Sequence, residues 1–386
     1  MKKLLILLGL AGAGALAYWY LRPTPLPGYD PAYREYAYVT NGRSNSVSVI
    51  DLRTFRLAKT IPVGANPTGV TANAKKNELY VVNNGSNNIS VIDAERNQVV
   101  TAIGVHGRPY FIDVSLDGKR GYVANSGSDN VSVIDLEKRQ VLATMRVGVA
   151  PGLARVAPDG KTVVVSNRGD DTVSLLDPLG LKARASLPVC QNPEDIVILP
   201  DSSKAFVTCS KSHQVAAIDL KADKVLALLD VGNTPVRLAL KPDGGELMVC
   251  NFDSDNISII ESTTNEVGGS YLIGTRPTRA VVSLDNARLY VSNFGSNNVA
   301  VYDIDNGKVI ASVPVGSRPD GLALTPDQNY LLVLGSGSGD VTVIEKRKPK
   351  KFEPSEYRLL TMIPVGIQPN DIAIKAFVQP HPAGRN

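Results

Sequence analysis

The sequence is poor in the residues that hold metals and attached cofactors. Its 386 residues include three Cys, three His and one Trp, and no Cys-x-x-Cys or Cys-x-x-Cys-His motif occurs. These absences exclude covalently attached c-type haem and zinc-ribbon sites. A phosphate-binding loop, a hydrolase nucleophile elbow and a helical metal-binding motif are also missing. We therefore predict no catalytic residue, no metal site and no cofactor from sequence motifs.

An excess of either charge is also missing. The chain has 41 Lys and Arg against 37 Asp and Glu, and 43% of its residues are hydrophobic, which is typical of a globular protein. Lys2, Lys3 and Arg22 lie in or beside an apolar N-terminal run, so the remainder is nearly neutral. Nucleic-acid-binding proteins usually carry a clear basic excess. The balance argues against nucleic acid as a partner, and a nucleic-acid-binding propeller stays only as an alternative function.

The first residues predict export. Lys2 and Lys3 precede an uncharged, mostly apolar run over residues 4–21. As a signal peptide, this run would be cleaved after Ala17, where Ala15-Leu16-Ala17 has the required small residues. As a signal anchor, its length of about 27 Å barely spans a membrane, with the aromatic residues 18–20 at the interface. Both interpretations place the body in the periplasm or at the cell surface, and the second tethers it to the inner membrane.

The body repeats with a period of 42 residues, which is typical of β-propeller blades. A Gly-x-x-Pro element ends at Pro67, Pro109, Pro151, Pro193, Pro235, Pro277, Pro319 and, after a longer step, Pro369, although its Gly is blurred near Pro109 and replaced by Cys190 before Pro193. A second marker ends a β-rich tetrapeptide at Asn41, Asn83, Asn125, Asn167, Cys209, Asn251, Asn293 and Gly335. A third closes the following strand at Asp51, Asp93, Asp135, Asp177, Asp219, Glu261, Asp303 and Glu345. Three markers in step identify one structural unit repeated along the chain.

Each unit predicts four strands, A to D, as in Thr68–Ala72, Leu79–Val82, Ile89–Ile92 and Val99–Ile103. Their β-branched residues favour strands, and no segment of the body has a helical period. The fold class is therefore all-β.

The chain ends predict how the ring closes. The repeat begins with a strand B at Ala37–Thr40 and ends with a lone strand A at Asp371–Ile374. Together these ends complete one more blade, which gives an eight-bladed propeller of four-stranded blades and leaves no open sheet edge. Seven blades with one set outside the ring is the alternative. The predicted divisions are a leader over 1–22, a Pro-rich tether over 23–35, the propeller over 36–378 and a tail over 379–386.

The tetrapeptide Tyr38-Val39-Thr40-Asn41 resembles the signature of the YVTN β-propeller repeat family. Variants recur at residues 80–83, 122–125 and 290–293, whereas Phe206-Val207-Thr208-Cys209 departs from the signature. The resemblance spans nearly the whole body. It implies an exported or surface-associated propeller that acts as a binding or scaffold protein without assigned chemistry.

The strand order predicts the position of a binding site. D–A and B–C loops share one end of the ring, and propeller ligands usually meet the channel there. Residues two and four after each Pro should face the channel by period-two alternation. The predicted mouth residues are Arg108, Tyr110, Arg155, Glu194, Asp195, Arg237, Arg276, Arg279, Arg318 and Asp320. The recurring Asn and Asp markers are instead expected to maintain turns, because a ligand site should lie where blades differ.

The other end of the ring carries a basic segment. Residues 346–351 include Lys346, Arg347, Lys348, Lys350 and Lys351, in the connection that lengthens the last repeat. The tether should enter from the same end, so we expect this loop to face the membrane and its anionic headgroups.

Three further interpretations remain open. His106 or His213, with Glu194, could serve a lyase or hydrolase at the mouth. Cys190, Glu194, Asp195, Cys209 and His213 come from one repeat and could bind zinc or copper. Cys209 and Cys250 occupy near-equivalent positions in adjacent repeats and could form a disulfide. The leading interpretation is an envelope binding or scaffold module whose partner is an unidentified envelope protein or glycan.

Overall fold

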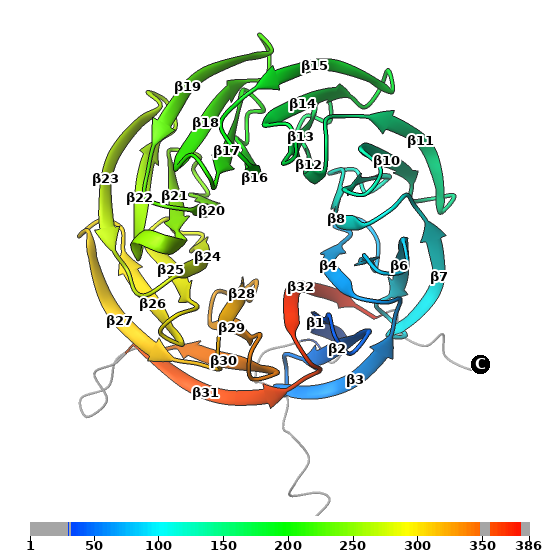
Figure 1. Ribbon diagram of the computed structural model, residues 1–386. Helices are drawn as coiled ribbons and strands as arrows, with labels where there is room; N and C mark the ends of the chain where they lie inside the picture. The colour runs from blue at the N-terminus through cyan, green and yellow to red at the C-terminus, as the bar shows by residue number, and fades with distance from the viewer. Residues whose placement is uncertain (1–29, 31, 348–355, 380–386) are drawn as a thin grey trace, which may run out of the picture.

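The computed structural model describes residues 30, 32–347 and 356–379. In Figure 1, eight sheets surround a central channel like the blades of a propeller. Each sheet has four antiparallel strands, ordered from strand A at the channel to strand D at the outer edge. The expected all-β, eight-bladed propeller is therefore confirmed, and the seven-bladed alternative is wrong.

The strands follow the predicted repeat, and the blades are numbered here in chain order. Blade 1 contains β32 (Pro369–Val378), β1 (Tyr33–Asn41), β2 (Ser46–Asp51) and β3 (Arg56–Pro62). Blade 2 contains β4 (Pro67–Ala72), β5 (Glu78–Asn83), β6 (Asn88–Asp93) and β7 (Gln98–Gly104). Blade 3 contains β8 (Pro109–Val114), β9 (Arg120–Asn125), β10 (Asn130–Asp135) and β11 (Gln140–Arg146). Blade 4 contains β12 (Pro151–Val156), β13 (Val163–Asn167), β14 (Thr172–Asp177) and β15 (Lys182–Pro188).

The second half of the ring is built in the same way. Blade 5 contains β16 (Pro193–Ile198), β17 (Lys204–Cys209), β18 (Gln214–Asp219) and β19 (Lys224–Asp230). Blade 6 contains β20 (Pro235–Leu240), β21 (Glu246–Asn251), β22 (Asn256–Glu261) and β23 (Glu266–Leu272), with a 3₁₀ turn η1 (Phe252–Ser254) in its B–C loop. Blade 7 contains β24 (Pro277–Val282), β25 (Arg288–Asn293), β26 (Asn298–Asp303) and β27 (Lys308–Pro314). Blade 8 contains β28 (Pro319–Leu324), β29 (Tyr330–Gly335), β30 (Asp340–Lys346) and β31 (Tyr357–Pro364).

The hydrophobic core lies between neighbouring blades. One cluster joins Phe206 and Val215 of blade 5 to Leu238 and Val249 of blade 6. Strands B and C are buried on both faces, which explains their nearly continuous apolar sequences. Within the described residues, no helix is long and apolar enough to span a membrane.

The two ends of the chain close the ring in blade 1. Strand β1 pairs with β32 from Tyr33↔Val378 to Asn41↔Pro369, so the first and last strands share one sheet. The predicted closure is confirmed. Strand β1 begins at Tyr33, three residues before the boundary expected for the propeller.

The Gly of the Gly-x-x-Pro element packs against the recurring Asn. A Cβ on Gly64 would lie 2.7 Å from the Cβ of Asn83, and Asn residues crowd the corresponding Gly148, Gly232, Gly274 and Gly366. The same Asn side chains donate hydrogen bonds across the B–C turn, as from Asn83 Nδ2 to Asn88 and Ser90. The two sequence markers thus form one contact, in which glycine makes room for the asparagine.

Blade 5 replaces this contact with a covalent bond. Cys190 occupies the Gly position and Cys209 the Asn position, and they form a disulfide with their Cα atoms 5.5 Å apart. The considered pairing of Cys209 with Cys250 is therefore wrong, and Cys250 is a buried free thiol. The departure from the tetrapeptide signature at Cys209 is explained by its partner 19 residues earlier.

We predict that Gly64→Ala destabilises the protein by about 1–3 kcal/mol, because the added methyl group overlaps Asn83. Gly104→Ala is the matched control, since nothing lies within 4 Å of its added Cβ. Urea denaturation of both variants measures the difference. Equal unfolding free energies would contradict the proposed Gly–Asn contact.

Candidate functional site

Hydrogen bonds between the B–C and D–A loops shape the channel mouth. In each blade, the third residue after the Asn-position marker accepts a hydrogen bond from the D–A loop of the same blade, as Ser128 Oγ does from the Gly107 N–H. The acceptors are Ser44, Ser86, Ser128, Asp170, Ser212, Ser254, Ser296 and Ser338. These bonds confirm that both loop types share one end of the ring.

The fourth residue after the marker links each blade to the next. Its side chain accepts a hydrogen bond from the residue that precedes the next blade's Pro, as Asn87 Oδ1 does from the Arg108 N–H at 2.9 Å. The acceptors are Asn45, Asn87, Asp129, Asp171, His213, Asp255 and Asn297, and Gly339 occupies the position in blade 8. Recurring loop residues therefore maintain the turns, as predicted, and the residues that differ among blades are left to form a site.

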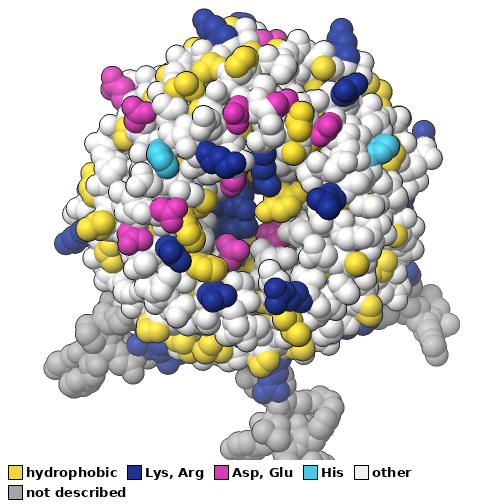
Figure 2. Space-filling view, in the orientation of Figure 1, with side chains coloured by type: hydrophobic (Ala, Val, Ile, Leu, Met, Phe, Trp, Pro, Cys, Tyr) yellow, Lys and Arg dark blue, Asp and Glu magenta, His cyan; other side chains and the backbone are white. Residues whose placement is uncertain are grey.

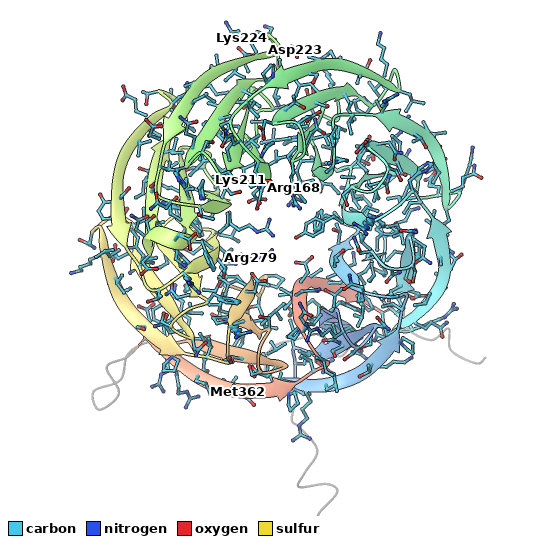
Figure 3. The ribbon with its side chains drawn as sticks, viewed as in Figure 1. Arg168, Lys211, Asp223, Lys224, Arg279 and Met362 are labelled. Atoms are coloured by element: carbon cyan, nitrogen blue, oxygen red, sulfur yellow. A yellow bond between two sulfur atoms is a disulfide. The ribbon has the colours of Figure 1, made fainter. Side chains whose placement is uncertain are left out.

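Three ion pairs line the channel between the innermost strands. Arg155 pairs with Asp113 at 3.5 Å, Arg237 with Asp195 at 3.2 Å, and Arg279 with Asp371 at 3.6 Å. Of the residues that the alternation along strand A predicts to face the channel, Arg155, Arg237, Arg279 and Asp371 line its cavity. Figure 3 shows Arg279 extending into the opening and Arg168 and Lys211 near its inner edge.

Each carboxylate also joins two blades through the backbone. Asp195 Oδ2 accepts a hydrogen bond from the Leu238 N–H, and Asp371 Oδ2 accepts one from the Val70 N–H, both at 2.9 Å. Asp113 binds the Val156 N–H in the same way. These acids stabilise the ring by linking neighbouring blades, and they also hold the arginines in the channel.

The third pair skips a blade. Arg279 comes from blade 7 and Asp371 from blade 1, while blade 8 places Gly321 at the equivalent position. A Cβ on Gly321 would overlap Leu334, so the wall of the channel carries no side chain there. The guanidinium of Arg279 therefore reaches Asp371 past a position that carries no side chain.

Electrostatics favour a charged Arg237. Burial acts to lower its pKa, but the carboxylate of Asp195, together with Tyr110, Asp320 and Asp371, more than compensates. The pKa of Arg237 therefore lies above its ordinary value, and the channel keeps a fixed cation at this level.

These side chains surround a cavity of about 230 Å³ at the centre of the ring. Its lining includes Tyr110, Phe111, Arg155, Arg237, Arg279, Asp320, Asn370 and Asp371. Figure 2 shows basic side chains at the opening and within the channel, with acidic ones between them. A cavity of this composition can accept an anionic group by hydrogen bonds from guanidinium donors.

Four arginines at the mouth stack on aromatic rings. Their guanidinium carbons lie 4.5 to 6.0 Å from the ring centroids. The pairs are Arg155 on Phe111, Arg168 on Tyr110, Arg276 on Phe252 and Arg318 on Phe294. Such stacking restricts an arginine while its planar edge still donates hydrogen bonds.

The predicted mouth residues fall into three groups. Arg155, Asp195, Arg237 and Arg279 form the channel pairs, and Tyr110 and Asp320 line the cavity with them. Arg108, Arg276 and Arg318 lie on the exposed rim, directly before their Pro residues. Glu194 accepts hydrogen bonds from Asn192 Nδ2 and Ser210 Oγ, so it is engaged within blade 5.

Sequence reasoning did not select Arg168, Phe252 or Phe294. Each follows the marker Asn directly, where other blades have Gly42, Asn84, Ser126 and similar small or polar residues. Comparison of that single position among the repeats would have identified them.

The other hypotheses are not supported by the contacts. His106 Nε2 lies 3.0 Å from Thr144 Oγ1, and His213 Nδ1 accepts a hydrogen bond from the Thr234 N–H. The considered metal ligands do not meet: Cys190 and Cys209 are bonded to each other, and Asp195 turns to Arg237. The part of the chain that the structure describes contains no group of three or more potential metal ligands.

The basic segment at the other end is only partly described. Lys346 Nζ lies 3.8 Å from Glu356, and the Arg347 N–H binds the Glu356 carbonyl. Lys348, Lys350 and Lys351 lie outside the described residues.

Comparisons with known proteins support the assignment of the chain to the β-propellers. The YNCE-like beta-propeller family profile matches residues 22–156, and the profile of lactonase, a 7-bladed beta-propeller, matches residues 274–355. Both matches support a β-propeller and neither covers half of the chain. No curated protein matches the sequence.

Solved structures share the fold at low identity. A chain of Kuenenia stuttgartiensis hydrazine synthase aligns with a TM-score of 0.59 at 21% identity, covering 72% of this chain and 95% of that one. The dihydro-heme d1 dehydrogenase NirN, solved in complex with DHE, aligns with a TM-score of 0.73 at 15% identity. The alignment covers 92% of this chain and 77% of that one. A functionally unknown protein from Desulfotomaculum acetoxidans DSM 771 aligns with a TM-score of 0.58 at 14% identity. The alignment covers 72% of this chain and 95% of that one. At these identities the likeness concerns the fold alone.

We predict that His213 acts as an asparagine substitute in its loop. His213→Asn should change the unfolding free energy by less than about 0.5 kcal/mol, because Asn supplies the same acceptor at a positive φ of 58°. His213→Gly permits this φ but removes the acceptor, so it should cost about 1 kcal/mol. Chemical denaturation measures both, and equal stability of the two variants would refute the assigned role.

The free thiol gives a chemical test of the blade 5 disulfide. Burial, reinforced by Asp195 and opposed by Arg237 and Arg279, raises the pKa of Cys250 to about 12. The folded, unreduced protein should therefore show no thiol reactive toward Ellman's reagent at pH 8. Denaturation without reductant should expose one thiol, and denaturation with reduction should expose three. Three reactive thiols before reduction would exclude the disulfide.

Proposed function

We propose that this chain is an exported, membrane-tethered β-propeller that binds a ligand or partner at its channel mouth in the cell envelope. The arginines of the channel would hold anionic groups of that ligand or partner. The role is binding or scaffolding, and the resemblance to YVTN repeat propellers is consistent with it.

The observation that carries the binding proposal is the convergence of Arg155, Arg237 and Arg279 on one cavity. They come from blades 4, 6 and 7, and each is held by a carboxylate while about 30% of its side chain or slightly less stays exposed. Arginines positioned before a ligand arrives need little further ordering, which favours affinity. Their pairing with acids favours a carboxylate-like ligand of modest charge over a dense polyanion.

Two features support export. The basic start and apolar run over residues 4–21 form the pattern of a signal peptide or anchor, although they lie outside the described residues. The disulfide of Cys190 and Cys209 fits an oxidising compartment. If the segment is retained as an anchor, the basic loop from Lys346 would lie near the membrane.

The histidine contacts favour binding over the enzymatic alternative. A general acid or base at the mouth should lie within hydrogen-bond reach of a polarising carboxylate. His106 and His213 instead contact Thr144 and Thr234. The mouth offers arginines with Tyr110 and Phe111, a composition suited to recognition. Its interspersed acids would repel a nucleic-acid backbone.

Citrate, a small polycarboxylate, tests the channel site. We expect the leader-free protein to bind citrate at low ionic strength, and Arg237→Gln/Arg279→Gln to weaken binding about tenfold or more, because charge-assisted hydrogen bonds are lost. Isothermal titration calorimetry measures the change. Arg56→Gln, an exposed residue of β3, is the control and should bind as the natural protein does.

Thermal unfolding must show that the double variant is folded. Citrate binding that is absent from the natural sequence, or equal in the double variant and the control, would reject the channel as an anion site.

A further inference from the structure

A second cationic surface lies on the rim over blades 6 to 8. It consists of Phe252, Arg276, Phe294 and Arg318, and we call it the rim ladder. Arg276 lies over Phe252 at 5.4 Å, Arg318 lies over Phe294 at 6.0 Å, and the two rings are 6.0 Å apart. The ladder is separate from the residues that line the channel cavity.

The ladder arises from two repeat positions, one in the B–C loop of a blade and one in the D–A loop that follows it. Phe252 and Phe294 follow the marker Asn in the B–C loops of blades 6 and 7. Arg276 and Arg318 precede the Pro in the D–A loops of blades 7 and 8. Arg108 has the same position in blade 3, but the preceding blade offers Asn84 there, which binds the Pro109 carbonyl instead. Ring and guanidinium therefore occur together only where adjacent blades supply both.

The backbone of each ladder arginine is fixed while its charge stays available. The Arg276 N–H binds Asp255 Oδ1 and the Arg318 N–H binds Asn297 Oδ1, each with a positive φ near 50°. Both side chains are exposed, and neither forms an ion pair with another described residue. The three channel arginines, in contrast, are already paired with acids. Arg276 and Arg318 thus keep positive charge at the mouth that no described ion pair neutralises.

We propose that the rim ladder binds an acidic segment of a partner protein, with carboxylates of that segment engaging the edges of Arg276 and Arg318. A stacked guanidinium presents parallel N–H donors that match a carboxylate. Arginine clusters are a common means of recognising acidic motifs. This inference rests on the proposed function as an exported binding module and names the class of its partner.

Charge around the ladder favours a protein segment over a uniform polyanion. Asp253 is exposed next to Phe252, and Asp320 follows Arg318 and Pro319. Closely spaced phosphates or uronates would meet these acids as well as the arginines. A peptide can place Glu or Asp at the arginines and a neutral or basic residue at the acids.

The orientation of the chain favours a partner away from the bilayer. Strand β1 runs from Tyr33 at the opposite end of the ring to Asn41 at the mouth, where the Gly42 N–H binds the D–A loop at Gln368. A tether that enters at Tyr33 would place the membrane beyond the opposite end. The ladder would then face outward, toward envelope proteins.

The test uses a labelled hexapeptide of alternating Glu and Gly and the leader-free protein. Fluorescence anisotropy at low salt should detect binding that the Gln-Gly peptide lacks. Arg276→Gln/Arg318→Gln should weaken it about tenfold, and Phe252→Leu/Phe294→Leu about threefold, because the charge remains but stacking is lost. Arg56→Gln/Arg146→Gln removes two exposed arginines from the outermost strands and should leave affinity unchanged.

Competition and citrate titration separate the possible outcomes. An oligogalacturonate or oligothymidylate that binds more tightly than the peptide, and depends equally on Arg276 and Arg318, would overturn the protein partner. Equal losses in the ladder and control variants would overturn the site. Ladder variants should retain citrate binding, so loss of the channel site and loss of the ladder are measured independently.

Discussion

The pairing of β1 with β32 closes the ring, and every other position depends on that closure. Each blade buries both faces of strands B and C against its neighbours, so a missing blade would expose two apolar sheet faces. Blade 1 receives its strand A from the end of the chain and its strands B to D from the beginning. Closure therefore couples the two ends of the sequence and fixes a channel into which eight equivalent strands present their side chains.

Most polar side chains at the mouth form the recurring hydrogen bonds that hold the loops. Only a small set of side chains is left for recognition. The Ser, Asn and Asp acceptors of the B–C loops hold the D–A loops in nearly the same way in all blades, even where His213 takes the place of Asn or Asp. A cysteine pair can replace the Gly–Asn contact at the same positions. Because the backbone is held by these recurring bonds, substitutions such as Arg168, Phe252 and Gly321 can change the mouth without changing the fold.

The sequence predicted the architecture well because the same markers and strand pattern recur in every repeat. Strand order, eight blades, closure and the channel-facing Arg and Asp residues all follow from periodicity and alternation. The partners of those residues do not follow from periodicity. Arg279 reaches Asp371 across a blade because Gly321 is small, which depends on distances across the channel. Likewise, Cys190 pairs with Cys209 within one blade, whereas similarity of position suggested Cys209 and Cys250.

Ion pairing divides the mouth arginines into two kinds. In the channel, Asp113, Asp195 and Asp371 neutralise the guanidinium groups. The other carboxylate oxygen of each acid accepts a hydrogen bond from a backbone N–H of the following blade. Those acids cannot be removed without leaving buried donors unsatisfied, so the ring itself limits how positive the channel becomes. On the rim, Arg276 and Arg318 are held by stacking on Phe252 and Phe294, which orders them without cancelling their charge. Unpaired charges on the rim attract an opposite charge over about 8 Å in physiological salt. An approaching acidic partner would therefore meet the rim first and the channel only after docking.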